Sequence, residues 1–312
     1  MLTRPLPETG RGWGWGTLTR LFLGCPIWAH KGWIGSLFPK GTKSGAFLRE
    51  YARRLNTVEG NTTFYAVPAP ETLARWQADT PNGFHFCPKI PRAVSHAGAL
   101  RPNLDEARRF GELMAHGLGS RLGPIFLQLP PRYSPKMLDD LRAFLEAWPT
   151  NIRLAVEVRH LDWFDSQADA ALNDLLREHD AARVLIDTRP IRDMPEAEVG
   201  EESVYVRLQQ AQERKPNVPL LPERTASFAF VRYIGHPNLE LNEPLLAEWA
   251  RRAAGWLAEG ADVYVFCHCP DENVDPWLCR ELHRRVAALA PIAPLPWDEV
   301  EPSDTAAQGR LL

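Results

Sequence analysis

Short apolar runs alternate with longer amphipathic segments along most of this 312-residue chain. The runs are nearly continuous in apolar side chains, as in Val263-Tyr264-Val265-Phe266, which is typical of parallel strands covered on both faces. The longer segments carry apolar residues three and four positions apart, as in Leu138, Leu141 and Leu145, which places them on one face of a helix. This alternation predicts repeated β/α units rather than an all-helical or all-β fold.

The pattern predicts eight strands and at least seven helices. Strands are expected at 21–24, 57–61, 84–89, 124–129, 154–158, 183–187, 227–234 and 262–267. Helices are expected at 44–54, 70–78, 104–116, 135–147, 167–179, 243–259 and 274–289. Eight such units predict an α/β fold of the single (β/α)₈ TIM-like barrel type. An open doubly wound sheet is the alternative, but no Gly-x-Gly-x-x-Gly follows a strand.

The segment 188–226 breaks the regular alternation. Its portion 201–215 fits either a helix or a strand at 204–206, and we predict a helix. An insertion after the sixth strand lies on the side of a barrel that forms active sites, so it is either a lid or substrate wall or a tolerated surface excursion.

The two ends of the chain lack the alternating pattern. Residues 1–20 are glycine-rich, which predicts a flexible N-terminal arm. We expect the barrel to span residues 21–290 and an extended C-terminal tail to span 291–312.

The best N-terminal apolar run, 21–28, is too short to span a bilayer, so we expect no membrane association. Five cysteines, an odd and scattered set, fit a reducing compartment and predict a cytoplasmic protein. The net charge of -3 excludes a globally basic surface for coating nucleic acid.

Polar side chains lie at or just after the carboxyl ends of most predicted strands, where a barrel places its active site. They are Glu59, Asn61, Lys89, Gln128, Glu157, Arg159, His160, Asp187, Arg232 and His268. Because side chains alternate along a strand, Glu59 shares a face with Asn61, and Glu157 shares one with Arg159. Buried charges require partners, so we expect a hydrogen-bonded charge network that forms a pocket or only braces the barrel.

These residue types indicate acid–base chemistry on an anion. Glu59, Glu157, His160 and Asp187 are the candidate catalytic groups. Anion and substrate binding is expected from a wider set: Trp28, Asn61, Tyr65, Lys89, His96, Gln128, Arg159, Arg232 and His268. The aromatic members either stack on a ligand or cap the barrel. The histidines and carboxylates show no metal-ligand spacing, so a divalent metal is not favoured and the cofactor is unknown.

Several ordered motifs resemble one known family. They are Leu23-Gly24-Cys25-Pro26-Ile27-Trp28, 56–65, Lys89-Ile90-Pro91, Ser95-His96, 126–131, 156–160, 186–190, 215–219, 230–235 and His268-Cys269-Pro270-Asp271. These segments resemble the YecE-like family (domain of unknown function number 72) over about residues 21 to 290. The resemblance implies a TIM-like barrel and no established reaction.

The C-terminal residues resemble a second, shorter motif. Gln308-Gly309-Arg310-Leu311-Leu312 is similar to the Gln-x-x-Leu-Phe peptides of bacterial sliding-clamp partners, with Leu312 in place of Phe. In such a mode Gln308, Leu311 and Leu312 would contact the clamp, whereas the alternative is a tail without a partner.

Two functions follow from these observations. The first is a hydrolase or lyase acting on an anionic, phosphate-bearing small molecule or nucleic acid. The second is a non-catalytic ligand- or DNA-associated protein held at a sliding clamp by its tail.

Overall fold

The computed structural model describes residues 21–193 and 202–300. All eight predicted strands are present, together with a helix at the irregular segment. The strands are β1 (Leu21–Gly24), β2 (Thr57–Gly60), β3 (His85–Pro88), β4 (Ile125–Gln128), β5 (Leu154–Glu157), β6 (Ala182–Asp187), β7 (Phe228–Ile234) and β8 (Asp262–His268). The helices are α1 (Phe47–Ala52), α2 (Pro70–Asp79), α3 (Arg92–Ser95), α4 (Leu104–Leu118), α5 (Leu138–Ala147), α6 (Ser166–Glu178), α7 (Arg189–Arg192), α8 (Glu202–Arg214), α9 (Glu243–Ala258) and α10 (Asp275–Ala287).

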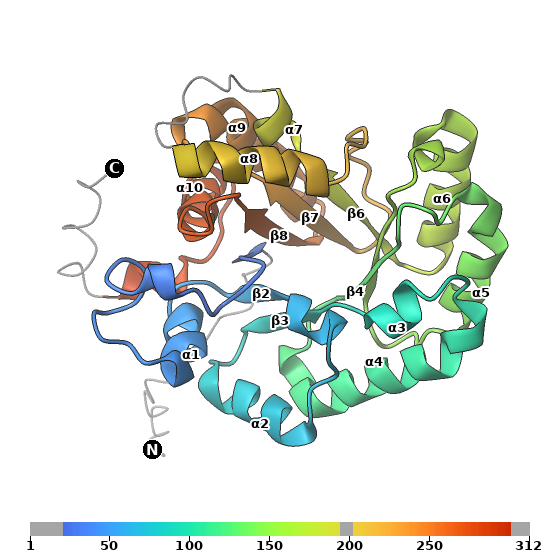
Figure 1. The fold of residues 1–312 in the computed structure, drawn as a ribbon, viewed down its shortest axis with the longest axis horizontal. Coiled ribbons are helices and arrows are strands. Elements are labelled where there is room, and N and C mark those ends of the chain that lie inside the picture. Colours follow the sequence, from blue (N-terminus) through green and yellow to red (C-terminus); the bar gives the residue numbers. More distant parts are fainter. Residues whose placement is uncertain (1–20, 194–201, 301–312) are drawn as a thin grey trace, which may run out of the picture.

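Parallel pairing organises the strands into two hydrogen-bonded groups. Six strands follow the order β1-β8-β7-β6-β5-β4, and β2 pairs with β3. Helices surround them, with α9 and α10 on one side, α5 and α6 on another, and α1, α2 and α4 on a third (Figure 1). The α/β class is therefore confirmed. The closed TIM-like barrel stays a prediction, because the ladders form two groups rather than one ring.

Local contacts connect the two groups of strands. The Glu59 N–H donates to the Cys25 carbonyl at 3.1 Å beside β1, and isolated parallel bridges join Phe86 to Leu122 and Lys89 to Phe126 beside β4. Gly24 permits the close approach of β1 to β2, since a Cβ there would lie 2.0 Å from the Thr57 carbonyl oxygen. A side chain at this position therefore cannot be accommodated without moving backbone.

Alternate side chains of each strand pack into different cores. In β7, Ala229 and Val231 join the large core beneath the helices, whereas Phe228 and Phe230 join a second cluster, the inner cluster, on the opposite face of the strand. The inner cluster comprises Phe22, Cys87, Phe126, Ala155, Ala182, Val184, Ala226, Phe228, Phe230, Tyr264 and Phe266. The next residue on that inner face is polar in several strands: Gln128, Glu157, Arg232 and His268. The alternation thus places a polar layer above an aromatic interior.

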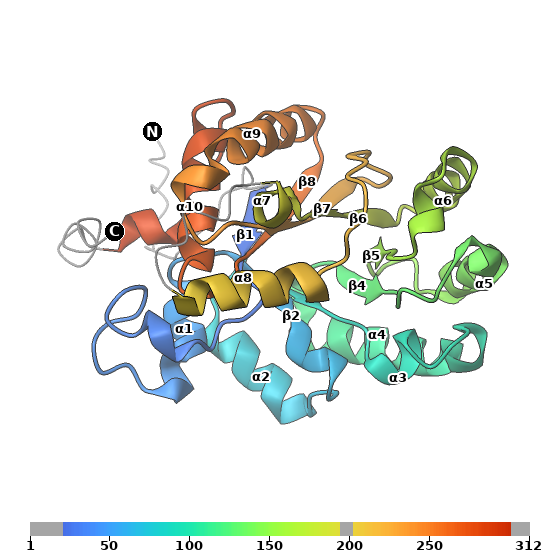
Figure 2. The same ribbon diagram turned by 45° about the horizontal axis from the view of Figure 1, so that its top comes forward.

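The helix predicted at 201–215 is α8, and it extends across the molecule between the α1–α2 side and the α9–α10 side (Figure 2). Its residue Leu208 is buried in a small cluster with Ile186, Ile191 and Ile234. These apolar contacts hold the insertion against the ends of β6 and β7.

The folded region extends past the boundary predicted at residue 290. Leu295 and Trp297 are buried in the core, and a 3-10 helix spans Pro296–Glu299. Two isolated apolar residues among prolines carry no periodicity, so the sequence pattern did not indicate this packing. The arm at 1–20 and the rest of the predicted tail, including Gln308, Leu311 and Leu312, lie outside the described residues.

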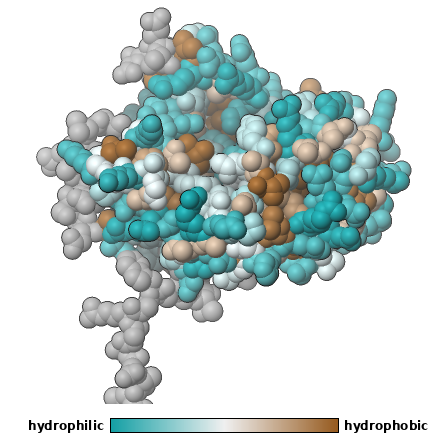
Figure 3. Space-filling model, turned by 60° about the horizontal axis from the view of Figure 1, so that its bottom comes forward, coloured by the Kyte–Doolittle hydropathy of each residue, from teal (hydrophilic) through white to brown (hydrophobic). Residues whose placement is uncertain are grey.

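The outer surface is mainly polar on the face shown in Figure 3, where hydrophobic residues form small separate patches. In the ranges 21–193 and 202–300, the structure contains no helix with the length and apolarity needed to cross a bilayer.

Candidate functional site

A cavity of about 850 Å³ opens at the carboxyl ends of the strands. Its lining comes from the strand ends, the loops that follow them and α8: Pro26, Ile27, His30, Asn61, Phe64, Tyr65, Lys89, Arg92, His96, Gln128, Arg159, Arg207, Gln210, Ala211, Arg214, Lys215, Arg232, His268, Cys269, Pro270, Asp271, Glu272 and Asn273. The predicted insertion therefore forms one wall of the cavity, as a substrate wall would.

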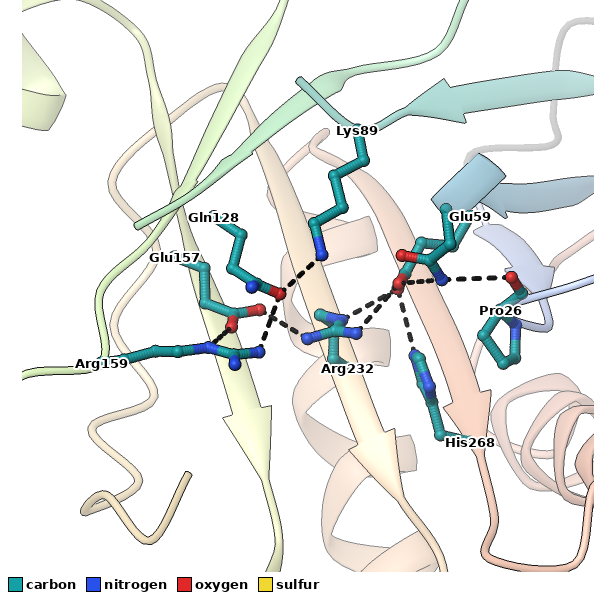
Figure 4. A network of polar contacts seen from close by, with 9 residues as sticks. Pro26, Glu59, Lys89, Gln128, Glu157, Arg159, Arg232 and His268 are labelled. Atoms are coloured by element: carbon teal, nitrogen blue, oxygen red, sulfur yellow. Dashed lines mark hydrogen bonds and ion pairs between the residues drawn. The ribbon is translucent and has the colours of Figure 1, made fainter. Parts of the chain in front are cut away.

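The floor of the cavity is built around Arg232, an inner-face residue near the carboxyl end of β7 (Figure 4). Its Nε and Nη2 donate to the two carboxylate oxygens of Glu59, both at 2.9 Å, and its Nη1 donates to Glu157 at 2.6 Å. Both carboxylates are completely buried. One guanidinium thus satisfies two buried acids from opposite sides, which explains how these charges are tolerated inside the protein.

Glu59 has two further partners. Asn61 donates to it at 2.7 Å, and His268 Nε2 lies 3.1 Å from the carboxylate. Burial opposes ionisation of Glu59, but Arg232 and then His268 outweigh it and hold the pKa of this carboxyl well below its usual range. Burial also lowers the pKa of His268 to about 4, so its neutral ring donates Nε2–H to Glu59 at neutral pH.

Glu157 is paired with two guanidinium groups. Besides Arg232, it accepts a hydrogen bond of 2.5 Å from Nε of Arg159. Burial is the largest influence and opposes ionisation, but Arg159 and Arg232 lower the pKa of Glu157 to about 2. Both floor carboxylates are therefore ionised, occupied by guanidinium groups and poorly suited to accept a proton at neutral pH.

Lys89 differs from the arginines because its hydrogen-bond partner is neutral. Its Nζ donates to Oε1 of Gln128 at 2.9 Å, and that same oxygen accepts a bond of 2.8 Å from Arg159 (Figure 4). The ammonium also lies 4.1 Å from the centre of the Phe64 ring. Burial, followed by the positive charge of Arg232, lowers the pKa of Lys89 to about 8.

Cationic residues dominate the described lining. Seven contribute: Lys89, Arg92, Arg159, Arg207, Arg214, Lys215 and Arg232. Two carboxylates, Asp271 and Glu272, line the same cavity, and Glu59 and Glu157 lie beneath it. The cations therefore outnumber the acids, and the low-dielectric walls concentrate a positive potential in the cavity.

The predicted residues Tyr65 and His96 form part of the outer wall. Tyr65 is 80% exposed and packs edge-on against Phe64, which also contacts the His96 ring. Burial and the charge of Lys89 lower the pKa of His96 to about 4, so this ring is neutral at neutral pH. Ten of the thirteen predicted strand-end and aromatic residues are thus brought to the cavity or its floor.

Three predicted residues lie elsewhere. Asp187 has the opposite orientation in β6 from the inner-face residue Ile186, and it binds Arg189 and the Trp249 indole beneath the helices. His160 turns back toward Asp162 outside the cavity.

Trp28 is the third predicted residue that lies away from the cavity. It packs edge-on against Trp76 and Phe86 and lines a separate surface pocket. Its apolar packing therefore accounts for its position without a ligand.

Sequence reasoning missed the cations supplied by loops and by α8. Arg92 begins α3, Arg207 and Arg214 lie on α8, and Lys215 follows it. A charged residue on an exposed helix is indistinguishable from an ordinary solvated one by periodicity. The only available signal was the position of the insertion after the sixth strand.

Potential metal ligands and thiol groups are present in the part of the chain that the structure describes. No group of three or more His, Cys, Asp or Glu side chains is arranged there to hold a metal ion. The five cysteines are free and buried, and burial raises the pKa of the Cys25 thiol well above its usual value.

Together, the parallel strands, surrounding helices and cationic cavity define an α/β protein with a cation-lined cavity at the strand ends. Comparison with known proteins makes this class more specific. The chain belongs to the family described as Protein of unknown function DUF72, whose model matches residues 22–300. It is 35% identical over 264 residues to UPF0759 protein YecE of Escherichia coli K12, a match that covers 84% of this chain and 91% of that protein.

Solved structures show the same fold. A DUF72 family protein from Enterococcus faecalis V583 has a TM-score of 0.60 at 15% identity, covering 88% of this chain and 99% of that one. A DUF72 family protein from Thermotoga maritima MSB8 has a TM-score of 0.58 at 19% identity, covering 86% and 99%. These similarities define the architecture and name no reaction.

Proposed function

We propose that the cavity binds an anionic, phosphate-bearing ligand and that the protein is a hydrolase or lyase acting on it. In this proposal the eight strands close as a TIM-like barrel, and the cavity is its mouth. The supporting observation is the position of Lys89: a buried ammonium beside Arg159, sharing one neutral amide oxygen with it. An incoming phosphate oxygen would give this ammonium the charged partner that the floor does not supply.

The floor network supports an anion rather than a cation. Glu59 and Glu157 are saturated by guanidinium groups and are fully buried, so they present no free carboxylate to a ligand. Their effect is to position Arg232 and Arg159. The outer cations Arg92 and Lys215 extend the positive lining away from the floor and would contact a second anionic group of a longer ligand.

Isothermal titration calorimetry with inorganic phosphate tests the binding part of this proposal. We expect saturable binding by the full-length chain and at least a tenfold weaker affinity for Lys89→Met. Lys43→Met is the matched control, because Lys43 is exposed and outside the cavity lining. Equal affinities of all three proteins, or no binding by any, would contradict the proposal.

The catalytic part requires a separate measurement. The wild type and Lys89→Met proteins should be screened against phosphate esters and nucleic acids, with and without divalent metals. We expect turnover by the wild type that Lys89→Met loses. Phosphate binding without turnover on any substrate would favour a binding protein over an enzyme.

A further inference from the structure

The placement of lysine in this chain is selective. The sequence contains six lysines among 36 basic residues, and four of them, Lys31, Lys40, Lys43 and Lys136, are exposed. The other two, Lys89 and Lys215, line the cavity. A lysine differs chemically from an arginine because its amine can lose a proton and act as a nucleophile, whereas a guanidinium stays charged.

The backbone of Lys89 is held firmly at the end of β3. Its N–H is bonded to Thr63 Oγ1 at 2.9 Å, and its carbonyl accepts from the same hydroxyl at 2.6 Å. The side chain then passes along the Phe64 ring and ends at Gln128. The backbone of Lys215 is also held, since its N–H donates to the Ala211 carbonyl and its carbonyl accepts from Arg192, both at 2.9 Å. Its Nζ, unlike that of Lys89, has no hydrogen-bond partner among the described residues. Of the two amines, Lys89 has the fixed geometry that a reacting nitrogen requires.

The surroundings of Lys89 favour a reactive amine. The residue is only 7% exposed, and the adjacent charges on Arg159 and Arg232 already have Glu157 and Glu59 as partners. In the described residues no carboxylate forms an ion pair with Nζ of Lys89. Desolvation and neighbouring cations are the two conditions that activate a lysine as a nucleophile.

We propose that Lys89 forms an imine with the carbonyl group of a phosphorylated aldehyde or ketone. This inference rests on the proposed function, because the other cations of the wall, Arg92 and Lys215, hold the phosphate group of the substrate while the amine of Lys89 reaches its carbonyl. The neutral amine nitrogen attacks the carbonyl carbon, the C=O π pair moves to oxygen, and proton transfer from nitrogen to oxygen gives a carbinolamine. A further proton converts the hydroxyl to departing water as C=N forms, giving a protonated imine.

The same geometry suggests what such an imine would do. The positive nitrogen withdraws electrons from the bond next to the former carbonyl carbon, which is the requirement for lyase chemistry. The pKa of about 8 at Lys89, lowered by burial and by Arg232, leaves a useful fraction of neutral amine near neutral pH. Burial lowers the pKa of Lys215 to about 8 as well, so the geometry and not the pKa selects Lys89.

Reductive trapping tests this inference directly. The full-length protein is incubated with dihydroxyacetone phosphate and sodium cyanoborohydride, whose hydride reduces the imine to a stable secondary amine. Peptide mass spectrometry then locates the adduct among the six lysines. We expect modification at Lys89, at least tenfold less with unphosphorylated dihydroxyacetone, and suppression by inorganic phosphate. Lys89→Arg should form no adduct in the cavity, whereas Lys43→Arg should behave as wild type.

The outcomes separate this inference from the proposed function. Phosphate binding in calorimetry without an adduct at Lys89 would overturn the imine and leave anion binding intact. Neither binding nor an adduct would overturn both. An adduct at Lys215, or equal modification of the exposed lysines, would overturn the assignment to Lys89. If Lys89→Arg is unfolded, the location of the wild-type adduct and its dependence on the phosphate group still decide the question.

Discussion

The positively charged side chains on the floor of the cavity and those on its wall have different partners. On the floor, Arg232 is enclosed by Glu59 and Glu157, and every contact is made between side chains carried by strand ends or the residues just after them. On the wall, Lys89 has a neutral partner, and Arg92 and Lys215 come from loops or helix ends. Without a ligand, Arg232 on the floor already has carboxylate partners, whereas Lys89 on the wall has only a neutral one. We infer that the floor supports the fold and the wall supports binding.

The largest expected effect is loss of the floor's central cation. Arg232→Met leaves two buried carboxylates without their shared partner, and breaking a buried pair in this way costs about 3–5 kcal/mol. Urea denaturation of the variant should show that loss. Arg108→Met provides the control, since Arg108 forms an exposed pair with Asp105 and should change the free energy of unfolding by less than about 1 kcal/mol. Similar losses in both variants would remove the basis for treating the floor as structural.

A second substitution tests whether close strand packing holds the floor in place. Gly24→Ala would put a methyl group against the Thr57 carbonyl, and overpacking of this type costs about 1–3 kcal/mol. Gly45→Ala is the matched control, because nothing lies within 4 Å of the added carbon. Thermal unfolding of the two variants should differ clearly. An unchanged melting temperature for Gly24→Ala would mean that β1 and β2 can separate without loss.

The wall is expected to show the opposite behaviour. Lys89→Met replaces a buried cation that has no carboxylate of its own, so the free energy of unfolding should change by less than about 1 kcal/mol or increase. Urea denaturation, performed on the sample used for phosphate titration, compares the two properties. A destabilisation as large as that of Arg232→Met would assign Lys89 to the floor.

The smallest expected effect is a pH dependence of anion binding. Sulfate keeps a constant charge between pH 6 and 10, about the range over which Lys89 changes from ammonium to amine. Its pKa of about 8 predicts that sulfate binding is complete below that pH and weakens as the pH rises through it. Calorimetry across this range measures the change. Burial lowers the pKa of Lys215, in the same lining, to about 8 as well, so the slope should be reduced in Lys89→Met and disappear in the double variant Lys89→Met, Lys215→Met. An unchanged slope in Lys89→Met would assign the titration to another group.

Strand alternation explains which parts of the site were predictable. Alternation predicts that Glu59 shares a face with Asn61 and Glu157 with Arg159, and each of these pairs is joined by a hydrogen bond at the cavity or its floor. Asp187 ends its strand as well, but it lies on the opposite face from Ile186 and pairs with Arg189 instead.

Other parts of the site depend on contacts that no periodicity records. The aromatic contacts of Trp28 arise between segments distant in the chain, and the loop cations become part of the cavity only through the path of α8. The eight strands were predictable because each is a short apolar run between helices. The division of these strands into two hydrogen-bonded groups depends on the spacing between backbones, which the sequence pattern does not record.

A crystal structure of the protein soaked in inorganic phosphate tests the difference between floor and wall most directly. We predict that phosphate lies within hydrogen-bond distance of Lys89 Nζ, while Arg232 keeps its bonds to Glu59 and Glu157. Phosphate bound outside the cavity, or bound to Arg232 with either carboxylate displaced, would contradict the account.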